Sequence, residues 1–182
     1  MESIRSIYKI GYGPSSSHTM GPARAAKIFR KEFPAEKYRV TLYGSLAATG
    51  KGHLTDEILY KTLGKEETQI IWKPETTLPE HPNAMTFESI DAMGIQQDTQ
   101  TWFSIGGGEI TQTPGKKKAE SIYGLHEMDD ILLWCQKQGK NLWEYVADRE
   151  DSDIWDYLGE VWDVMRQSVK NGLDHESRLP GP

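Results

Sequence analysis

Hydrophobic residues recur along this chain with two different periods, and the two alternate over its first half. A period near 3.6 predicts helices over residues 22–33, 55–64, 127–138, 141–148 and 152–172. Period-two alternation and short apolar runs predict strands over residues 38–44, 68–73, 84–91 and 100–105. Helices alone complete the chain. This order predicts an α+β fold, with helices packed on a small mixed or antiparallel sheet and a helical C-terminal segment.

The first predicted helix follows a run of small polar residues, GPSSSHTMGP, at positions 13–22. Pro22 suits a first helical turn, because its missing N–H leaves no intrahelical hydrogen bond unmade. Unpaired N–H groups and the positive end of the helix dipole attract anions there, and hydroxyl groups add donors. The run therefore predicts a site for a carboxylate or a phosphate. The alternative is that one hydroxyl caps the helix while the others face water.

A second glycine-rich run, GSLAATGKGH at positions 44–53, follows the first predicted strand. Its glycines permit close backbone approach to a ligand, while Lys51 supplies a cation and His53 a titratable group. We interpret this run as a ligand loop, although Lys51 alone is typical of a solvated surface. It does not match a nucleotide-binding P-loop, because five residues separate Gly44 from Gly50 and Gly52 replaces the magnesium-binding hydroxyl.

These two runs, followed by LPEHPNAMTF (78–87) and SIGGG (104–108), resemble in order the N-terminal part of the iron-sulfur-dependent L-serine dehydratases. The resemblance extends from about residue 7 to the end of the chain. It implies a lyase that converts L-serine to pyruvate and ammonia without pyridoxal phosphate. A related fold serves as an allosteric domain in some phosphoglycerate dehydrogenases. The alternative function is therefore a non-catalytic regulatory module that binds serine or another small anion.

The resemblance implies a serine-binding pocket lined by Ser15, Ser16, Ser17, Thr19, Lys51 and Asn83. Within it, the hydroxyl groups and the helix N-terminus would receive the carboxylate. His18 and His53 are the candidates for acid-base catalysis, because imidazole titrates closest to neutral pH. The sequence does not rank the two, although the glycine-flanked position favours His53 as the base. For Asn83, an Asx-type turn after Pro82 is an equal alternative, and the glycines at 106–108 predict a backbone bend.

The resemblance also implies a [4Fe–4S] cluster, and clusters of this kind are bound mainly by three or four cysteine thiolates. This chain has one cysteine, Cys135, in an apolar helical run where we expect a small buried residue. We therefore predict no metal ligand here, and expect the cluster to be bound by a catalytic domain or subunit outside this chain. The chain would then be inactive by itself.

The last nine residues, 174–182, are polar and then rich in proline and glycine, which is typical of a linker. We interpret residues 1–173 as a serine dehydratase beta-type domain and 174–182 as the start of a linker to the cluster-binding domain. The expected partners are L-serine and that domain or subunit. The face that would meet the partner also allows a homo-oligomer.

Composition and charge argue against several classes of binding partner. A net charge of −6 and a pI near 5.4 argue against a nucleic-acid partner. No apolar run approaches the roughly 20 residues of a membrane span, and the N-terminus lacks the apolar stretch of a signal peptide. We therefore expect a cytoplasmic protein that binds no membrane.

Overall fold

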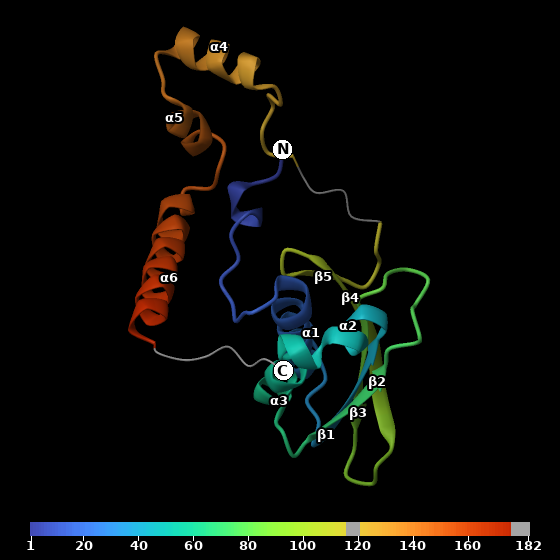
Figure 1. The fold of residues 1–182 in the computed structure, drawn as a ribbon. Coiled ribbons are helices and arrows are strands. Elements are labelled where there is room, and N and C mark those ends of the chain that lie inside the picture. The colour runs from blue at the N-terminus through green and yellow to red at the C-terminus, as the bar shows by residue number, and fades with distance from the viewer. Residues whose placement is uncertain (116–120, 176–182) are drawn as a thin grey trace. The chain divides into compact units, whose positions relative to one another are not determined.

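The computed structural model describes residues 1–115 and 121–175, which divide into two compact units. The larger unit contains residues 11–115, and the smaller contains residues 1–10 together with 121–175. Both are drawn in Figure 1. The predicted linker lies mainly in residues 176–182, outside the described residues.

A mixed sheet of five strands forms one layer of the larger unit. Its strands are β1 (Lys37–Tyr43), β2 (Thr68–Lys73), β3 (Ala84–Ile90), β4 (Gln96–Gly106) and β5 (Glu109–Thr111). Their order is β2-β1-β3-β4-β5, with β1 parallel to β2 and every other neighbouring pair antiparallel. The α+β class and the mixed sheet are therefore confirmed.

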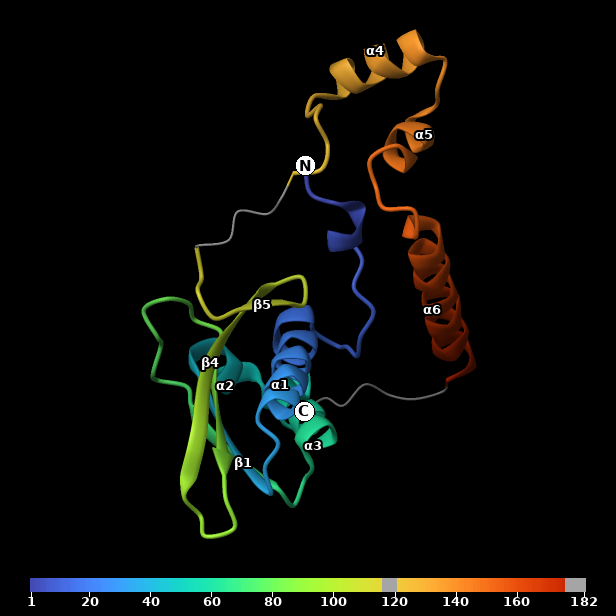
Figure 2. The same ribbon diagram turned by 180° about the vertical axis from the view of Figure 1, so that it is seen from behind.

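Helices of the larger unit cover one face of this sheet, with α1 (Gly21–Glu32) and α3 (Thr55–Leu63) side by side (Figures 1 and 2). The short helix α2 (Gly44–Thr49) directly follows β1. The core forms where alternate residues of β1 meet the helices, and its fully buried members include Phe29, Val40, Leu42, Leu59 and Phe87. The rings of Phe29 and Phe87 stack with centroids 5.5 Å apart. Burial of such side chains contributes about 1.5–3 kcal/mol each.

The smaller unit is helical, with η1 (Ile4–Ser6), α4 (Met128–Gln138), α5 (Leu142–Ala147) and α6 (Ile154–Asp174). Its small core contains Tyr123, Ile131, Cys135 and Tyr145. Cys135 is buried and free, as predicted. Across both described ranges, the helices are too short or too polar to cross a membrane.

The carboxylate of Glu150 fastens residues 3 and 4 to the helical part of the smaller unit. It accepts hydrogen bonds from the Ser3 hydroxyl at 2.6 Å, the Ile4 N–H at 2.8 Å and the Tyr123 hydroxyl. Burial raises the pKa of Glu150, but these donors and the charge of Arg5 outweigh it, so the pKa lies below its usual value. The carboxylate is therefore ionised at neutral pH.

All five predicted helices are present, each with bounds within two residues of those expected. The interpretation of residues 44–53 as a loop is wrong, because α2 and the turn η3 (Lys51–His53) occupy most of it. Leu46 and Ala47 are buried there, so the segment gains apolar contacts by forming a helix. Strand β4 also begins four residues earlier than predicted, and β5 was not predicted.

Candidate functional site

The polar run before α1 is itself helical. Residues Ser16–Met20 form a π-helical turn, η2, that leads directly into α1. Ser15 caps this turn, since its hydroxyl accepts a hydrogen bond from the His18 N–H at 3.1 Å. Ser15 is therefore the residue whose hydroxyl caps the helix, as the alternative interpretation of the polar run expected for one hydroxyl. The N–H groups of Ser16 and Ser17 lie in the first turn, where they have no intrahelical partner, so two donors remain at this N-terminus.

The His18 ring is buried and engaged at both nitrogens. Its Nε2 lies 3.3 Å from both the carbonyl and the hydroxyl oxygen of Ser45, and its Nδ1 lies 2.9 Å from the Ser17 hydroxyl. A carbonyl oxygen can only accept, so Nε2 carries the proton and the Ser17 hydroxyl donates to Nδ1. His18 therefore has no ring nitrogen left for a ligand.

His53 has the opposite arrangement. Its Nδ1 lies 2.9 Å from the backbone carbonyl of Thr49, so Nδ1 carries the proton and donates it. The lone pair on Nε2 is then the proton-accepting position of this half-buried ring. The centroids of the His53 and His18 rings are 4.7 Å apart, with the planes tilted by 35°.

Burial is the main cause that lowers the pKa of His18, because it disfavours the charged imidazolium. The nearby His53 lowers this pKa further by charge repulsion, while the hydrogen bond with Ser45 raises it in part. His18 is therefore neutral at neutral pH.

Two buried threonines tie the histidine segments together. The Thr19 hydroxyl donates to the His53 carbonyl at 2.8 Å, and the Thr55 hydroxyl donates to the His18 carbonyl at 2.6 Å. Thr19 also accepts from the Ser15 N–H at 3.3 Å. With only 1% of Thr19 exposed, its hydroxyl acts between segments of this chain, and its predicted contact with substrate stays a prediction.

The segment that contains Pro82 contacts the end of β1, next to the serine that binds His18. Gly44 has φ +47°, and a Cβ there would lie 2.7 Å from the Pro82 carbonyl oxygen, so glycine alone fits this close approach. Ser45, which contacts His18, donates its N–H to the same carbonyl at 3.2 Å. Asn83 therefore comes directly after Pro82, whose carbonyl is hydrogen-bonded to the serine that contacts His18.

Asn83 links this segment to the end of β4. Its Nδ2 donates to the Ser104 carbonyl at 3.4 Å, which anchors two strands and is not an Asx-type turn. Its Oδ1 and the Ser104 hydroxyl are buried, and neither has a hydrogen-bond partner in the described part of the chain. Ser104 faces the start of α1, because a Cβ on Gly21 would lie 2.4 Å from its hydroxyl. Such unpartnered buried polar atoms are typical of a position that a polar ligand or water completes.

The structure thus brings together Ser15, Ser17, His18, Thr19 and His53, with Ser16 exposed at the same helix start. We call these six residues the histidine site. Lys51 is not joined to them, since its exposed ammonium lies 5.6 Å from the centroid of the Trp72 ring. The glycines at 106–108 all have positive φ and turn β4 into β5, as the predicted bend required.

Sequence reasoning missed three residues of this arrangement, Ser45, Thr55 and Ser104. Ser45 follows a glycine at a strand end, which is a usable signal for a residue at a sharp turn. Thr55 and Ser104 carry no such signal, because their contacts join segments far apart in the sequence.

The residues of this chain do not fit an iron-sulfur cluster. Residues 1–115 and 121–175 contain no group of three or more His, Cys, Asp or Glu side chains that could bind a metal ion. Cys135 is the one cysteine of the chain and is buried in the core of the smaller unit. A cluster needs several thiolates, so these residues cannot supply its ligands.

Comparison with known families gives a match over the larger part of the chain. The family model described as serine dehydratase beta chain matches residues 3–69 and 61–114. These ranges include all of the residues of the histidine site.

Curated relatives match over nearly the whole chain. An L-serine dehydratase of Streptomyces coelicolor is 28% identical, over 98% of this chain and 51% of the relative. One of Haemophilus influenzae is 29% identical over 100% and 51%, and one of Mycobacterium bovis is 30% identical over 98% and 50%. The chain spans about half the length of the curated relatives it matches.

Proposed function

This chain belongs to the serine dehydratase beta chain family, and we propose that it forms the substrate-binding and proton-transfer part of an L-serine dehydratase. The single observation that carries the proposal is the state of His53. Its Nδ1 donates to a backbone carbonyl at 2.9 Å, which leaves Nε2 as a proton acceptor beside a buried, neutral His18. The names of the relatives supply the substrate, L-serine, and the lyase reaction.

In this proposal the start of the helix at Ser16 binds the carboxylate of L-serine. The N–H groups of Ser16 and Ser17 are donors without an intrahelical partner, and the positive end of the helix dipole adds to their attraction. Ser16 is exposed and so can reach a ligand, whereas the hydroxyls of Ser15 and Ser17 are occupied by the cap and by His18. Asn83 is the further proposed contact, since its Oδ1 lacks a hydrogen-bond partner in the described residues and can accept a bond from a donor such as the substrate ammonium.

The proton-transfer step belongs to His53. Its Nε2 takes the α-proton of L-serine, and the β-hydroxyl leaves as hydroxide, so that the molecule loses one water and becomes 2-aminoprop-2-enoate. Tautomerisation to the imine and addition of water then release pyruvate and ammonia. A general base of this kind contributes about 10²- to 10⁴-fold to the rate.

His18 acts in this scheme as a positioning residue. A neutral His18 avoids charge repulsion with His53 when His53 is protonated, and its Nδ1 accepts a hydrogen bond from the Ser17 hydroxyl. We further propose that any iron-sulfur cluster is bound by a domain or subunit outside this chain, because one cysteine cannot provide its ligands.

The test combines this chain with the C-terminal half of the Streptomyces coelicolor relative, reconstituted anaerobically with iron and sulfide, and measures pyruvate formed from L-serine. We expect pyruvate from the wild-type chain and a loss of about 10²-fold or more in kcat for His53→Gln. We expect Ser16→Pro, which removes one N–H donor, to raise KM with a smaller effect on kcat. His175→Gln, in an exposed position at the end of α6, is the matched histidine control and should retain full activity.

A normal kcat in His53→Gln would overturn the assignment of the base. If the combination makes no pyruvate while the isolated chain binds L-serine at Ser16 in an NMR titration, the dehydratase role is overturned and the regulatory module replaces it.

A further inference from the structure

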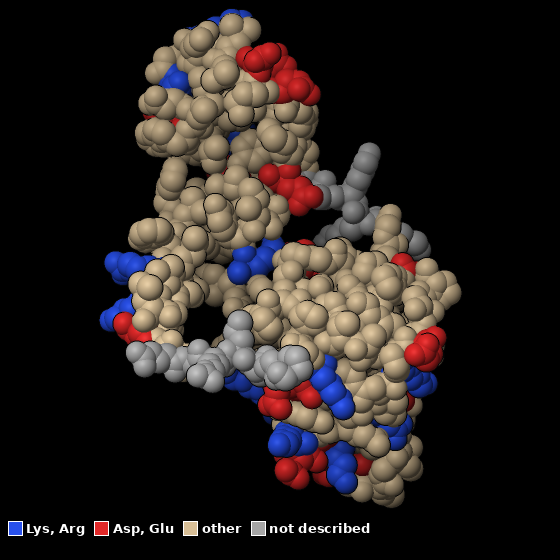
Figure 3. All heavy atoms as spheres, viewed as in Figure 1, with Lys and Arg blue, Asp and Glu red and all other residues tan. Residues whose placement is uncertain are grey.

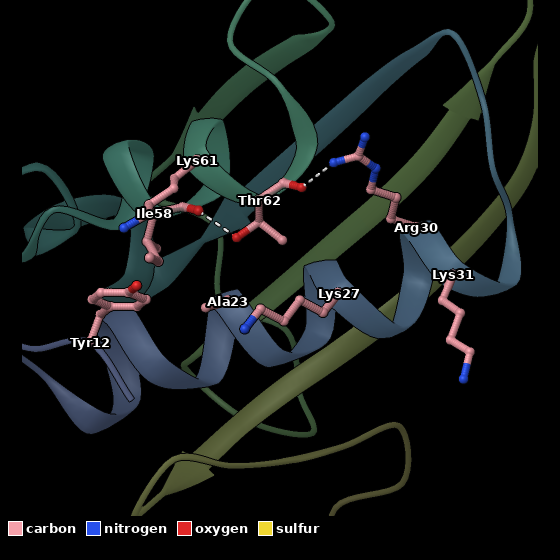
Figure 4. Close-up of a pocket in the computed structure, with 8 residues that line it drawn as sticks. All are labelled: Tyr12, Ala23, Lys27, Arg30, Lys31, Ile58, Lys61 and Thr62. Atoms are coloured by element: carbon pink, nitrogen blue, oxygen red, sulfur yellow. Dashed lines mark hydrogen bonds between the residues drawn. The ribbon is translucent and has the colours of Figure 1, made fainter. Parts of the chain in front are cut away.

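A groove between α1 and α3 shares no lining residue with the histidine site and takes no part in the proposed reaction. It encloses about 570 Å³ and is lined by Tyr12, Ala23, Lys27, Arg30, Lys31, Ile58, Lys61 and Thr62. Figure 4 shows the two helices with these side chains between and beside them. The volume is in the range of small-molecule sites.

The charge of this groove differs from that of the molecule. Four of its lining residues are cations and none is acidic, although the chain as a whole carries a net charge of −6. In Figure 3, acidic and basic side chains lie close together in the lower part of the larger unit. Within the described residues, none of the four cations forms an ion pair.

Two of the cations are oriented by contacts that leave their charge uncompensated. The Arg30 guanidinium donates to the backbone carbonyl of Thr62 at 2.6 Å, across the groove from α1 to α3 (Figure 4). The Lys61 ammonium lies 3.9 Å from the centroid of the Tyr12 ring. A carbonyl and an aromatic face both attract a cation without neutralising it. These cations are therefore pre-positioned for an anion.

The spacing on α1 adds to this argument. Lys27 lies three residues before Arg30 and four before Lys31, so like charges are neighbours on one helical face and repel one another. Arg30 and Lys31 are in the last turn, where cations stabilise the helix end, but Lys27 is further in. Stabilisation of the helix end thus does not account for the whole cluster.

Apolar groups form the floor of the groove. Ala23 and Ile58 are buried there, and the Tyr12 ring borders one end. An inorganic ion would leave this floor uncovered, whereas the carbon skeleton of an organic molecule would cover it. We propose that the groove binds a small organic anion that carries two or more carboxylate or phosphate groups, with Lys27, Arg30 and Lys61 as its charged contacts.

The experiment is a calorimetric titration of the full chain with citrate, at constant ionic strength, together with NMR shift mapping. Fructose 1,6-bisphosphate is titrated in parallel to distinguish phosphate from carboxylate recognition on a carbon skeleton, and acetate serves as the singly charged comparison. We expect saturable binding of citrate or fructose 1,6-bisphosphate that shifts the signals of Lys27, Lys61 and Tyr12, and much weaker binding of acetate. In the double variant Lys27→Gln/Lys61→Gln, we expect at least tenfold weaker binding.

Lys37→Gln is the matched control, because Lys37 is an exposed lysine on β1 outside the groove. It should bind the probe as the wild-type chain does. Equal losses in the Lys37 and the groove variants would mean non-specific charge attraction and would overturn the proposal. So would binding of neither probe, or displacement of citrate by an acidic peptide at lower concentration. A separate thermal melt of each variant verifies that it is folded, and Tyr12→Phe provides a second groove variant that keeps every charge.

Discussion

The buried hydroxyl of Thr55 donates a hydrogen bond of 2.6 Å to the backbone carbonyl of His18, across 37 residues of sequence. Its counterpart is the bond from Thr19 to the His53 carbonyl, which runs in the opposite direction between the same two segments. Each threonine therefore holds the histidine of the other segment. The separation of the two rings depends on hydroxyl groups that touch neither ring.

Thr55→Val tests this relationship, since valine keeps the shape of threonine and removes the hydroxyl. The His18 carbonyl would then be buried without this donor, which costs about 1–3 kcal/mol of unfolding free energy. Urea denaturation of the full chain measures that loss.

Thr49→Val is the matched control. Its exposed hydroxyl donates to the Ser45 carbonyl within the same short helix, so we expect a change within about 0.5 kcal/mol. Equal losses in both variants would contradict the structural role given to Thr55.

The unfolding free energy of the larger unit should fall when the pH is lowered and His18 accepts a proton. The pKa of His18 in the folded chain lies below its ordinary value of 6.5, so the unfolded chain binds more protons between these two values. The contribution of neutral His18 is complete above pH 6.5 and is lost as the pH falls from there through the lowered pKa.

The measurement is the unfolding free energy at about pH 7.5 and about pH 5.5, for the wild-type chain and for His18→Gln. We expect the wild-type chain to lose more stability between the two pH values than the variant does. A larger or equal loss in His18→Gln would contradict the lowered pKa.

The two histidines should be observed as opposite tautomers. His53 donates from Nδ1 to the Thr49 carbonyl, and His18 donates from Nε2 to Ser45. Long-range ¹H–¹⁵N NMR spectra at neutral to weakly alkaline pH distinguish a protonated from an unprotonated ring nitrogen. We expect a protonated Nδ1 in His53 and a protonated Nε2 in His18, and the same tautomer in both rings would contradict the assignment.

Periodicity was sufficient to predict the long elements of this chain. Tyr38, Val40 and Leu42 alternate with polar residues, and in β1 these three are buried. Helix α2 was not predicted, because glycines at both ends of a six-residue segment also describe a loop. Strand β5 has three residues and takes its structure from pairing with β4, which no local pattern encodes.

The candidate site, too, could be predicted from the sequence only in part. The hydroxyls and His18 could be predicted as a cluster because they are adjacent in sequence before a helix. That His53 lies against His18 could not be predicted, since tertiary contacts through Thr19 and Thr55 determine it. Nor could sequence alone rank the histidines, because the difference between them lies in which carbonyl each ring nitrogen meets.

The sharp turn from β1 into α2 should not tolerate a side chain at Gly44. At Gly44, φ is +47° and an added Cβ would lie 2.7 Å from the Pro82 carbonyl oxygen, so Gly44→Ala combines backbone strain with a clash. We expect a loss of about 1–3 kcal/mol in unfolding free energy, and a shift of the His18 ring signals because Ser45 must move. Gly52→Ala is the control, since nothing lies within 4 Å of a Cβ at that position. It should leave stability unchanged or raise it by about 0.4–1 kcal/mol. If Gly44→Ala proves as stable as Gly52→Ala, the close approach of this turn to Pro82 is not what positions Ser45 against His18.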